Sequence, residues 1–199
     1  MAFESDTLVV VTDPSKLAAD FGEVVAPGLT AAGAIEVRMG LALTGQLTGH
    51  HVLSSRWESL GEWMAANEAM AARMAPGGEL AHFAERYQIV QRMLSEDVVQ
   101  DGSATGAAFS ASRYSFTGPP QGFDHAASLA MGAGANGIRI VRFLAAGEWT
   151  GHFVGAIYYD SLDVMPGVLA ATTSDAEFVQ NVTEAGGRLE SRTVFEFVA

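Results

Sequence analysis

Cysteine is absent from the 199 residues of this chain, and lysine occurs once, as Lys16. Without cysteine the chain has no disulfides, thiolate nucleophiles, iron–sulfur clusters or cysteine-based zinc sites, so any metal would need His, Asp or Glu. The 11 basic residues are outnumbered by 23 acidic ones, which gives a formal net charge of −12. Because such a surface repels a polyanion, we expect no nucleic-acid partner.

Long apolar runs are also missing, although 49% of the residues are hydrophobic. A membrane-spanning helix needs about 18 or more apolar residues, and the longest candidate here, Leu8 to Val11, has the length of a strand. The first residues, MAFESDT, lack the basic segment and apolar core of a signal peptide. The sequence therefore predicts a cytoplasmic protein without a membrane partner.

What the sequence does contain is an internal repeat. The stretch Gly45 to Leu60 (GQLTGHHVLSSRWESL) recurs 102 residues later as Gly147 to Leu162 (GEWTGHFVGAIYYDSL), with seven of 16 positions identical. Unrelated segments would share about one. Since the offset is half the chain, we predict a duplicated protein with units at residues 1–100 and 101–199. The polar stretch Ser95 to Gly106 marks the boundary.

Both halves predict the same order of elements, βαββαβ. Alternating or β-branched runs predict the strands, at Thr7 to Thr12, Ile35 to Thr44, His50 to Trp57 and Tyr87 to Leu94, then at 107–116, 138–145, 152–159 and 189–198. Helical spacing or capping signals predict the helices, at Leu17 to Gly33, from Ser59 to Met74, around 80–86, at 122–131, near Asp163, and from the capping box Ser174 to Glu177.

A βαββαβ unit makes a four-stranded antiparallel sheet with helices on one face and a bare face on the other. Two such units in one chain can bury their bare faces against each other. The sequence therefore predicts an α+β fold in which two tandem ferredoxin-like units pack sheet to sheet as an intramolecular α+β barrel. Fusion removes the usual reason to dimerise, so we expect a monomer that is a pseudo-dimer, or a weak homodimer.

This layout resembles the dimeric α+β barrel superfamily in a fused form. The junction Trp57-Glu58-Ser59, from strand end to helix start, is similar to the W-x-S junction of antibiotic-biosynthesis monooxygenases and NIPSNAP-like proteins. The second half keeps a weaker version at Tyr159-Asp160-Ser161. The resemblance implies activities such as cofactor-independent oxygenation of phenolic polyketides, haem degradation, other haem chemistry or small-ring isomerisation.

The haem-degrading type, by this resemblance, needs an Asn in the first strand and a Trp and a His along the helix after the junction. Here the first strand reads TLVVVT, and no histidine follows the junction before His82, so those roles do not carry over. The oxygenase type relies on Asn, Trp and Tyr between sheet and helices. Trp57, Asn67 and Tyr87 supply these residue types in the first half.

Trp57 lies where a strand meets a helix, so its ring could line a cavity or plug the junction with Nε1 bonded to the backbone. Asn67 lies on an apolar helix stripe between Met64 and Met70, and a buried amide without a partner costs about 1 to 3 kcal/mol. Its partner would be either a neighbouring carbonyl or a ligand. Tyr87 and Tyr159 are the tyrosines placed at the ends of the predicted pocket strands.

His50 and His152 recur at the exit of the repeated turn. They could form a paired site, or each could bond its own turn. His51 points to the opposite face of the strand from His50, and the repeat aligns it with Phe153. Because only the first half has a polar group at this position, the first half is favoured as the active one. No spacing typical of a metal site is present, so no metal is expected.

Arg38 and Arg142 lie on the second strand of each unit. A charge that faced the barrel or the pocket would need an anionic ligand or an internal carboxylate. The candidate carboxylates for such an ion pair are Glu36, Glu58, Asp160 and Glu196. Both alternatives, a ligand-binding guanidinium and an internal ion pair, stay open on the sequence.

The combined hypothesis is a cofactor-independent, monooxygenase-like enzyme for a small, largely apolar or aromatic molecule. Its pocket between sheet and helices would contain Trp57, Asn67, His51 and Arg38, with His51 as base and Asn67 holding an oxyanion. The alternative is a non-catalytic module that binds a small molecule or haem, or that mediates an interaction. A cavity of roughly 300 Å³ or more with converging polar groups would favour the enzyme.

Overall fold

Eight strands close into one antiparallel barrel in the computed structural model, which describes residues 2–198. Around the barrel the order is β1-β3-β2-β8-β5-β7-β6-β4. The strands are β1 Phe3–Val11, β2 Glu36–Ala42, β3 His51–Trp57, β4 Tyr87–Gly102, β5 Ala108–Ser115, β6 Gly137–Ala145, β7 Phe153–Tyr159 and β8 Arg188–Phe197. Each unit contributes four consecutive strands to the ring, and the pairs β2–β8 and β4–β6 join the units. The predicted α+β barrel of two ferredoxin-like units is confirmed.

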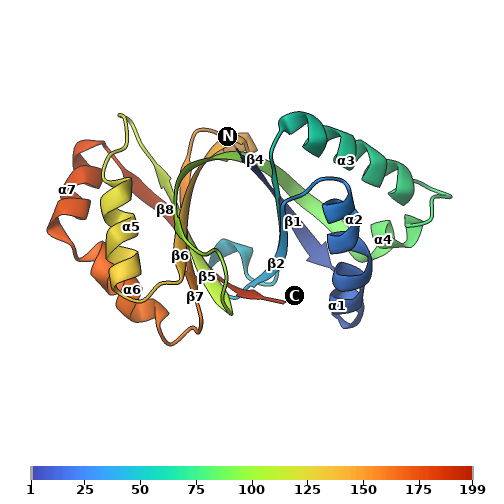
Figure 1. Cartoon of the computed structure of the whole chain (residues 1–199), viewed down its shortest axis with the longest axis horizontal. Helices are drawn as coiled ribbons and strands as arrows, with labels where there is room; N and C mark the ends of the chain where they lie inside the picture. The colour runs from blue at the N-terminus through green and yellow to red at the C-terminus, as the bar shows by residue number, and fades with distance from the viewer. Residues whose placement is uncertain (1, 199) are drawn as a thin grey trace.

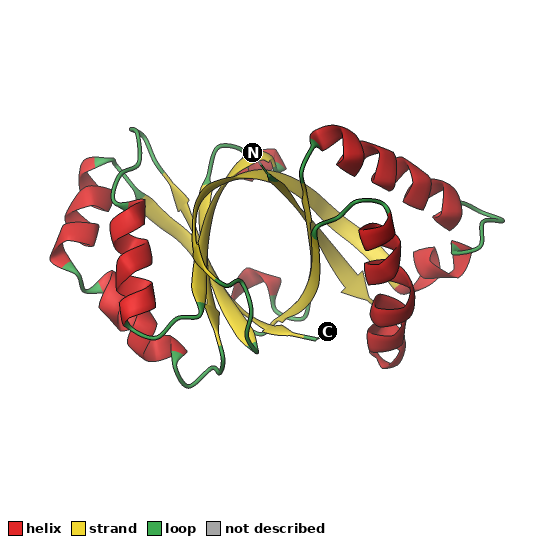
Figure 2. Cartoon of the chain, in the orientation of Figure 1, coloured by secondary structure: helices red, strands yellow, loops and turns green. Residues whose placement is uncertain are grey.

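Helices cover the outside of the barrel in two groups, one per unit, on opposite sides of the ring (Figure 1). The helices are α1 Leu17–Asp20, α2 Ala26–Ala31, α3 Leu60–Met74 and α4 Ala81–Arg86 in the first unit, and α5 Phe123–Gly132, α6 Met165–Thr173 and α7 Ala176–Glu184 in the second. Single 3-10 turns occupy Pro14–Lys16, Gly45–Leu47 and Gly147–Trp149. Figure 2 shows the ring of strands with all larger helices outside it. Across residues 2–198, no helix is both long enough and apolar enough to cross a membrane.

Local sequence signals explain how several helices begin. Ser59 caps α3, since its side chain accepts a hydrogen bond from the Glu62 N–H at 3.2 Å, as the capping-box spacing predicts. At α7 the prediction is off by one residue. Asp175, and not Ser174, is the cap, because its carboxylate accepts from the Phe178 N–H at 2.8 Å.

The first helix is not continuous as predicted. A π-helical turn at Phe21–Val25 separates α1 from α2, and the Ala26 N–H donates to the carbonyl of Phe21, five residues earlier. Pro27 follows directly, and a proline has no N–H to continue the regular ladder. The wider turn absorbs this break within the helical path.

The boundary stretch predicted between the units is a strand for most of its length. β4 runs from Tyr87 to Gly102, first beside β1 and then, from Leu94 onward, beside β6 of the second unit. The polar sequence of Ser95 to Gly106 therefore reflects a long strand at the seam between the two sheets. It is not a loop that links two separate bodies.

Candidate functional site

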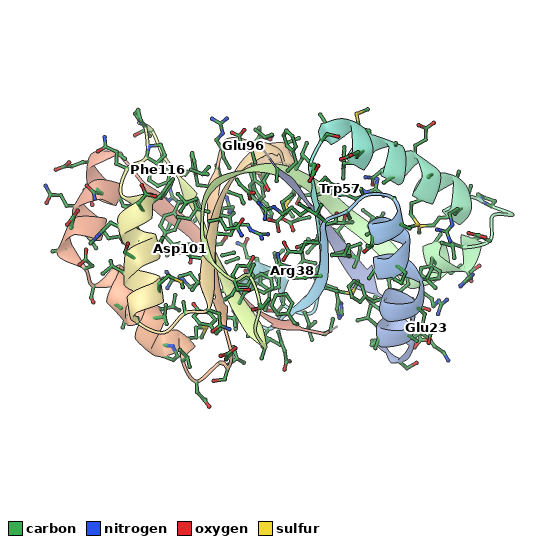
Figure 3. The ribbon with its side chains drawn as sticks, in the orientation of Figure 1. Glu23, Arg38, Trp57, Glu96, Asp101 and Phe116 are labelled. Carbon is green, nitrogen blue, oxygen red and sulfur yellow. The ribbon has the colours of Figure 1, made fainter. Side chains whose placement is uncertain are left out.

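Strand alternation divides the side chains of each sheet between the barrel interior and the helix layer. On β3, Leu53, Ser55 and Trp57 face the helices, whereas Val52 and Ser54 face the interior. Figure 3 shows the same division on two labelled residues, with Arg38 inside the ring and Trp57 outside it, toward α3. Two kinds of cavity result, and we call them outer and inner.

The outer cavity of the first unit lies between its sheet and its helices and has a volume of about 110 Å³. Its wall is mostly apolar, with a few polar side chains; the residues that shape it include Leu29, Met39, Leu53, Ser55, Trp57, Trp63, Asn67, Met70, Phe83, Tyr87 and Arg92. The volume is many times the roughly 10–15 Å³ that one water needs, and it is smaller than roughly 300 Å³. The size criterion for an enclosed, drug-sized ligand is therefore not met.

Trp57 is completely buried and lines this cavity. Its Nε1 donates to the Ser55 hydroxyl at 2.9 Å. The bond goes to a side chain, whereas the plugging alternative expected the backbone as partner. Because the indole N–H is already satisfied, what Trp57 offers a ligand is the face of its ring.

Asn67 lines the same cavity from α3. Its Nδ2 donates to the Trp63 carbonyl one turn earlier, at 2.8 Å. This is the neighbouring-carbonyl alternative, and it uses one of the two amide hydrogens. The helix therefore fixes the orientation of the amide, and the second hydrogen and the carbonyl oxygen remain for other partners.

Tyr87 contributes its ring to the cavity and directs its hydroxyl to a polar group of the helix layer. The hydroxyl donates to Asp20 at 2.6 Å, and Asp20 also pairs with Arg86 at 2.8 Å. Burial, followed by the hydrogen bond to Asp20, raises the pKa of Tyr87 well above its ordinary value. Tyr87 therefore stays protonated at neutral pH and is unsuited to act as a base there.

His51, the expected base, is not among the residues that line the outer cavity. It shares a strand face with Trp57, but six residues of extended strand separate the two by roughly 20 Å. Its Nδ1 is buried without a hydrogen-bond partner, and burial, with a smaller contribution from His50, lowers its pKa. The predicted grouping of His51 with Asn67 is therefore wrong.

Arg38 is also separated from the outer cavity. It alternates with Val37 and Met39 on β2 and faces the barrel interior. There its guanidinium pairs with Glu36 at 2.9 Å, donates to the Ala104 carbonyl, and lies 5.1 Å from the centroid of the Tyr158 ring. The structure thus divides the four residues of the predicted pocket among three places.

The two repeated histidines have different partners. His50 Nδ1 lies 3.1 Å from the Leu47 carbonyl, so it bonds its own turn. His152 Nδ1 accepts from the Arg113 guanidinium at 2.7 Å. The two residues occupy equivalent turns in separate units, and neither lines a cavity with the other.

Arg142 and Tyr159 both have internal partners. Arg142 forms an ion pair with Glu96, and its side chain is 47% exposed. The Tyr159 hydroxyl lies 2.7 Å from the Ser110 hydroxyl in a fully buried position. Neither lines the outer cavity of the second unit, which has a volume of about 50 Å³.

Strand register shows that Arg139, and not Arg142, is the counterpart of Arg38. Arg38 lies opposite Ser54, and Arg139 lies opposite Ala156 at the matching position of the second unit. Equivalent residues of the two units lie 102 positions apart from the hairpin turn onward and 101 positions apart on the strand before it, because the second turn is one residue longer. An alignment of the repeat without gaps therefore does not match Arg139 with Arg38.

The inner cavity lies within the barrel and also has a volume of about 110 Å³. One part of its wall is charged and the rest is mostly apolar or aromatic; the wall includes Glu4, Asp6, Arg38, Ser54, Met93, Phe109, Arg113, Arg139, Phe143, Trp149, Tyr158, Phe195 and Phe197. Glu4 and Asp6 were missed because the first strand was predicted to begin at Thr7. The alternation Glu4-Ser-Asp6 directly before that run was the available signal.

Arg139 is the centre of the charged part. Its side chain is 2% exposed, and it donates to Glu4 and to Glu36, each at 2.9 Å. Burial alone would lower its pKa, but the neighbouring acids, Glu4 first, outweigh burial and keep the pKa above its ordinary value. This buried guanidinium therefore stays charged and links the two units across the barrel.

Neither outer cavity fits haem. An axial histidine on a cavity wall is a common way to hold haem iron, and among residues 2–198 no histidine lines the inner or either outer cavity. Within the same residues, no group of three His, Asp or Glu side chains is placed to hold a metal ion. These three cavities therefore contain no histidine to hold haem iron, and residues 2–198 contain no cluster placed to hold a metal ion.

Solved structures with the same barrel extend over the whole chain. An anthrone oxidase-like protein matches with a TM-score of 0.54 at 14% identity, covering 100% of this chain and 92% of the other. A dye-decolorizing peroxidase from Bacteroides thetaiotaomicron matches with a TM-score of 0.59 at 9% identity, covering 98% and 92%. A variant of the chlorite dismutase from Candidatus Nitrospira defluvii matches with a TM-score of 0.58 at 10% identity, covering 100% and 91%.

These likenesses define the class of fold: the dimeric α+β barrel with two ferredoxin-like units fused in one chain. At identities of 9 to 14% they establish the fold alone. No protein-family model matches the chain, and no curated protein sequence matches it. The function must be argued from the cavities.

Proposed function

We propose that this chain is a monooxygenase-like enzyme that acts, without a cofactor, on a small, largely apolar or aromatic molecule. The observation that carries the proposal is the outer cavity of the first unit, where Trp57, Trp63 and Asn67 converge on an apolar space. The equivalent space in the second unit is about half as large. The likeness to an anthrone oxidase-like protein supports the same reaction class.

The reaction would convert a methylene group attached to an aromatic ring into a ketone. Two C–H bonds break and one C=O bond forms, while dioxygen supplies one oxygen atom to the product and the other to water. The substrate itself is the reductant, so anthrone and dioxygen give anthraquinone and water. No further electron donor is required.

The lining residues limit which substrates can react. Among the described residues, no carboxylate or histidine lines this cavity, so the substrate must have a C–H acidic enough to lose its proton to water. The free amide hydrogen of Asn67 would stabilise the enolate oxygen that forms. The ring faces of Trp57 and Trp63 would hold the aromatic part.

Oxygen uptake with anthrone and with one-ring analogues tests the proposal. We expect one dioxygen consumed per substrate, and a turnover number that falls roughly 10²-fold in Asn67→Ala, the loss typical of one oxyanion donor. Thr172→Val is the matched control, because Thr172 lines the outer cavity of the second unit and should leave the rate unchanged. Equal rates in wild type and Asn67→Ala would contradict the role of Asn67.

A second candidate, a non-catalytic small-molecule binding module, is favoured by the lack of a lining base and by the cavity volume of about 110 Å³, which is below the roughly 300 Å³ that would favour the enzyme. In that case the same probes would quench Trp57 or Trp63 fluorescence and raise the melting temperature, but no oxygen would be consumed above the buffer rate. Binding together with unchanged oxygen uptake would replace the enzyme proposal by this one.

A further inference from the structure

One charged cluster at the inner cavity contains three carboxylates and two guanidiniums: Glu4 and Asp6 on β1, Glu36 and Arg38 on β2, and Arg139 on β6. Glu36 belongs to the cluster through its ion pairs and is not itself a lining residue. A third guanidinium, that of Arg113, lines the cavity and donates to His152, outside this cluster. Arg139 is shared between Glu4 and Glu36, and Arg38 also pairs with Glu36. Among residues 2–198, no guanidinium forms an ion pair with Asp6.

Asp6 is therefore the unmatched group of the cluster. Among residues 2–198, its one hydrogen-bond partner is the Ser54 hydroxyl on β3. Burial, followed by repulsion from Glu4, raises its pKa to about 7, although Ser54, Arg38 and Arg139 act in the opposite direction. A partly buried carboxylate that faces a cavity in this situation gains most from a single additional positive charge.

The wall around this cluster is aromatic. Phe109 stacks on Phe195 with ring centroids 4.6 Å apart, and Phe197 and Tyr158 lie within 5.6 Å of Phe109. Burial raises the pKa of Tyr158 to about 12, so this ring stays neutral. Such rings attract both flat aromatic groups and cations.

Arg113 on β5 is the remaining cation that lines the cavity. Its guanidinium donates to His152 and lies 4.7 Å from the Trp149 ring centroid. It is thereby tied to the turn Gly147–Trp149 and its neighbour His152. Met93, which faces the cavity from β4, is apolar, and no acid or base of β4 lines the space.

We propose that the inner cavity binds a small aromatic amine in its cationic form, with the ammonium group on Asp6 and the ring against Phe109 and Phe195. A monocation supplies the one positive charge that the cluster lacks, and the aromatic wall accepts the rest of the molecule. This site is separate from the outer cavity and does not rest on the oxidation proposed above.

Titration calorimetry with three probes of one shape tests the proposal: benzylamine, benzyl alcohol and benzoate. We expect benzylamine to bind more tightly than benzyl alcohol at pH 8, and benzoate to bind least. Since only ionised Asp6 pairs with the ammonium, the affinity for benzylamine should rise about tenfold from pH 6 to pH 8. Benzyl alcohol should show no such rise.

Asp6→Asn removes the charge at nearly constant shape, and we expect it to abolish both the preference for benzylamine and its pH dependence. Asp97→Asn is the matched control, because Asp97 is a partly buried carboxylate that pairs with Arg56 and does not line the cavity. Trp57→Phe, in the outer cavity, should also leave benzylamine binding unchanged.

The wild-type probe series stands even if Asp6→Asn does not fold. Benzylamine that binds no more tightly than benzyl alcohol at pH 8 would overturn the proposal. So would tighter binding of benzoate, which would make the cavity an anion site at Arg113. Loss of benzylamine binding in Trp57→Phe would place the amine in the outer cavity and would equally overturn the assignment.

Discussion

The two units share one backbone plan and differ in what they enclose. At equivalent positions the first unit has Asp6 where the second has Ala111, as the pairing of each with Ser54 and Ala156 shows. The first unit has Trp57 where the second has Tyr159. The outer cavity is about 110 Å³ in the first unit and about 50 Å³ in the second.

The two units of this duplicated fold contribute different kinds of side chain to the cavities. The first unit carries most of the buried charge and the larger outer cavity. The second supplies Phe109, Phe195 and Phe197, which wall the inner cavity beside that charge, with the Arg38 guanidinium 5.8 Å from the Phe197 ring centroid. Charged and aromatic walls meet only because the barrel closes. The inner cavity is therefore a property of the pair of units and of neither unit alone.

The largest expected effect is a difference in stability between variants of Arg139 and of Arg142. Arg139→Leu leaves Glu4 and Glu36 without their shared partner, so we expect the free energy of unfolding to fall by about 3–5 kcal/mol. Arg142→Leu removes an ion pair from a half-exposed side chain, and we expect a loss below about 1 kcal/mol. Urea denaturation at pH 7 measures both. Equal losses would contradict the assignment of Arg139 as the buried link between units.

The next largest effect is the pH dependence of stability that Asp6 causes. Its pKa is raised from 3.8 to about 7 in the folded chain, so the folded state binds more protons than the unfolded state between these values, and stability falls as pH rises through them. Between pH 5 and 8 we expect a loss about 2–3 kcal/mol larger in wild type than in Asp6→Asn. Denaturation at both pH values tests this, and parallel losses would refute the raised pKa.

A smaller loss of stability is expected at Tyr159, the residue of the second unit that is equivalent to Trp57. Tyr159→Phe removes the hydroxyl that bonds Ser110 and keeps the ring, so we expect a loss of about 1 kcal/mol. The double variant with Ser110→Ala should recover part of that loss, because no buried hydroxyl is then left unpaired. Thermal or urea unfolding of the three variants measures the coupling. A double variant with fully additive losses would show that the bond contributes nothing.

The smallest effect is expected for His51→Phe, at a position that the repeat aligns with Phe153. Because His51 Nδ1 is buried without a partner, we expect His51→Phe to be neutral or slightly stabilising. The reverse change, Phe153→His, should destabilise by about 1–3 kcal/mol, since it adds an unpaired polar group among Phe116 and Phe123. A clear loss of stability or of oxygen uptake in His51→Phe would restore His51 as a functional residue.

Much of the fold followed from local pattern. Alternation located β2 and β3 within two residues, the capping box placed α3, and the repeat implied a two-fold related pair of units. Of the four residues predicted for the pocket between sheet and helices, Trp57 and Asn67 line it, and His51 and Arg38 do not. Tyr87, which the family resemblance suggested, lines it as well. Local pattern failed at β4, because a polar strand at a seam has the same composition as a linker.

By itself, the sequence determined the duplicated βαββαβ order and the side of the sheet on which Trp57 lies, because strand periodicity and helix caps act over a few residues. Which residues line the inner cavity depends on the tertiary structure alone. Arg139 meets Glu4 across 135 residues of chain, and this contact depends on register and on barrel closure. A one-residue shift in register reverses the face of every side chain on a strand, so only the closed barrel reveals which charges are buried together.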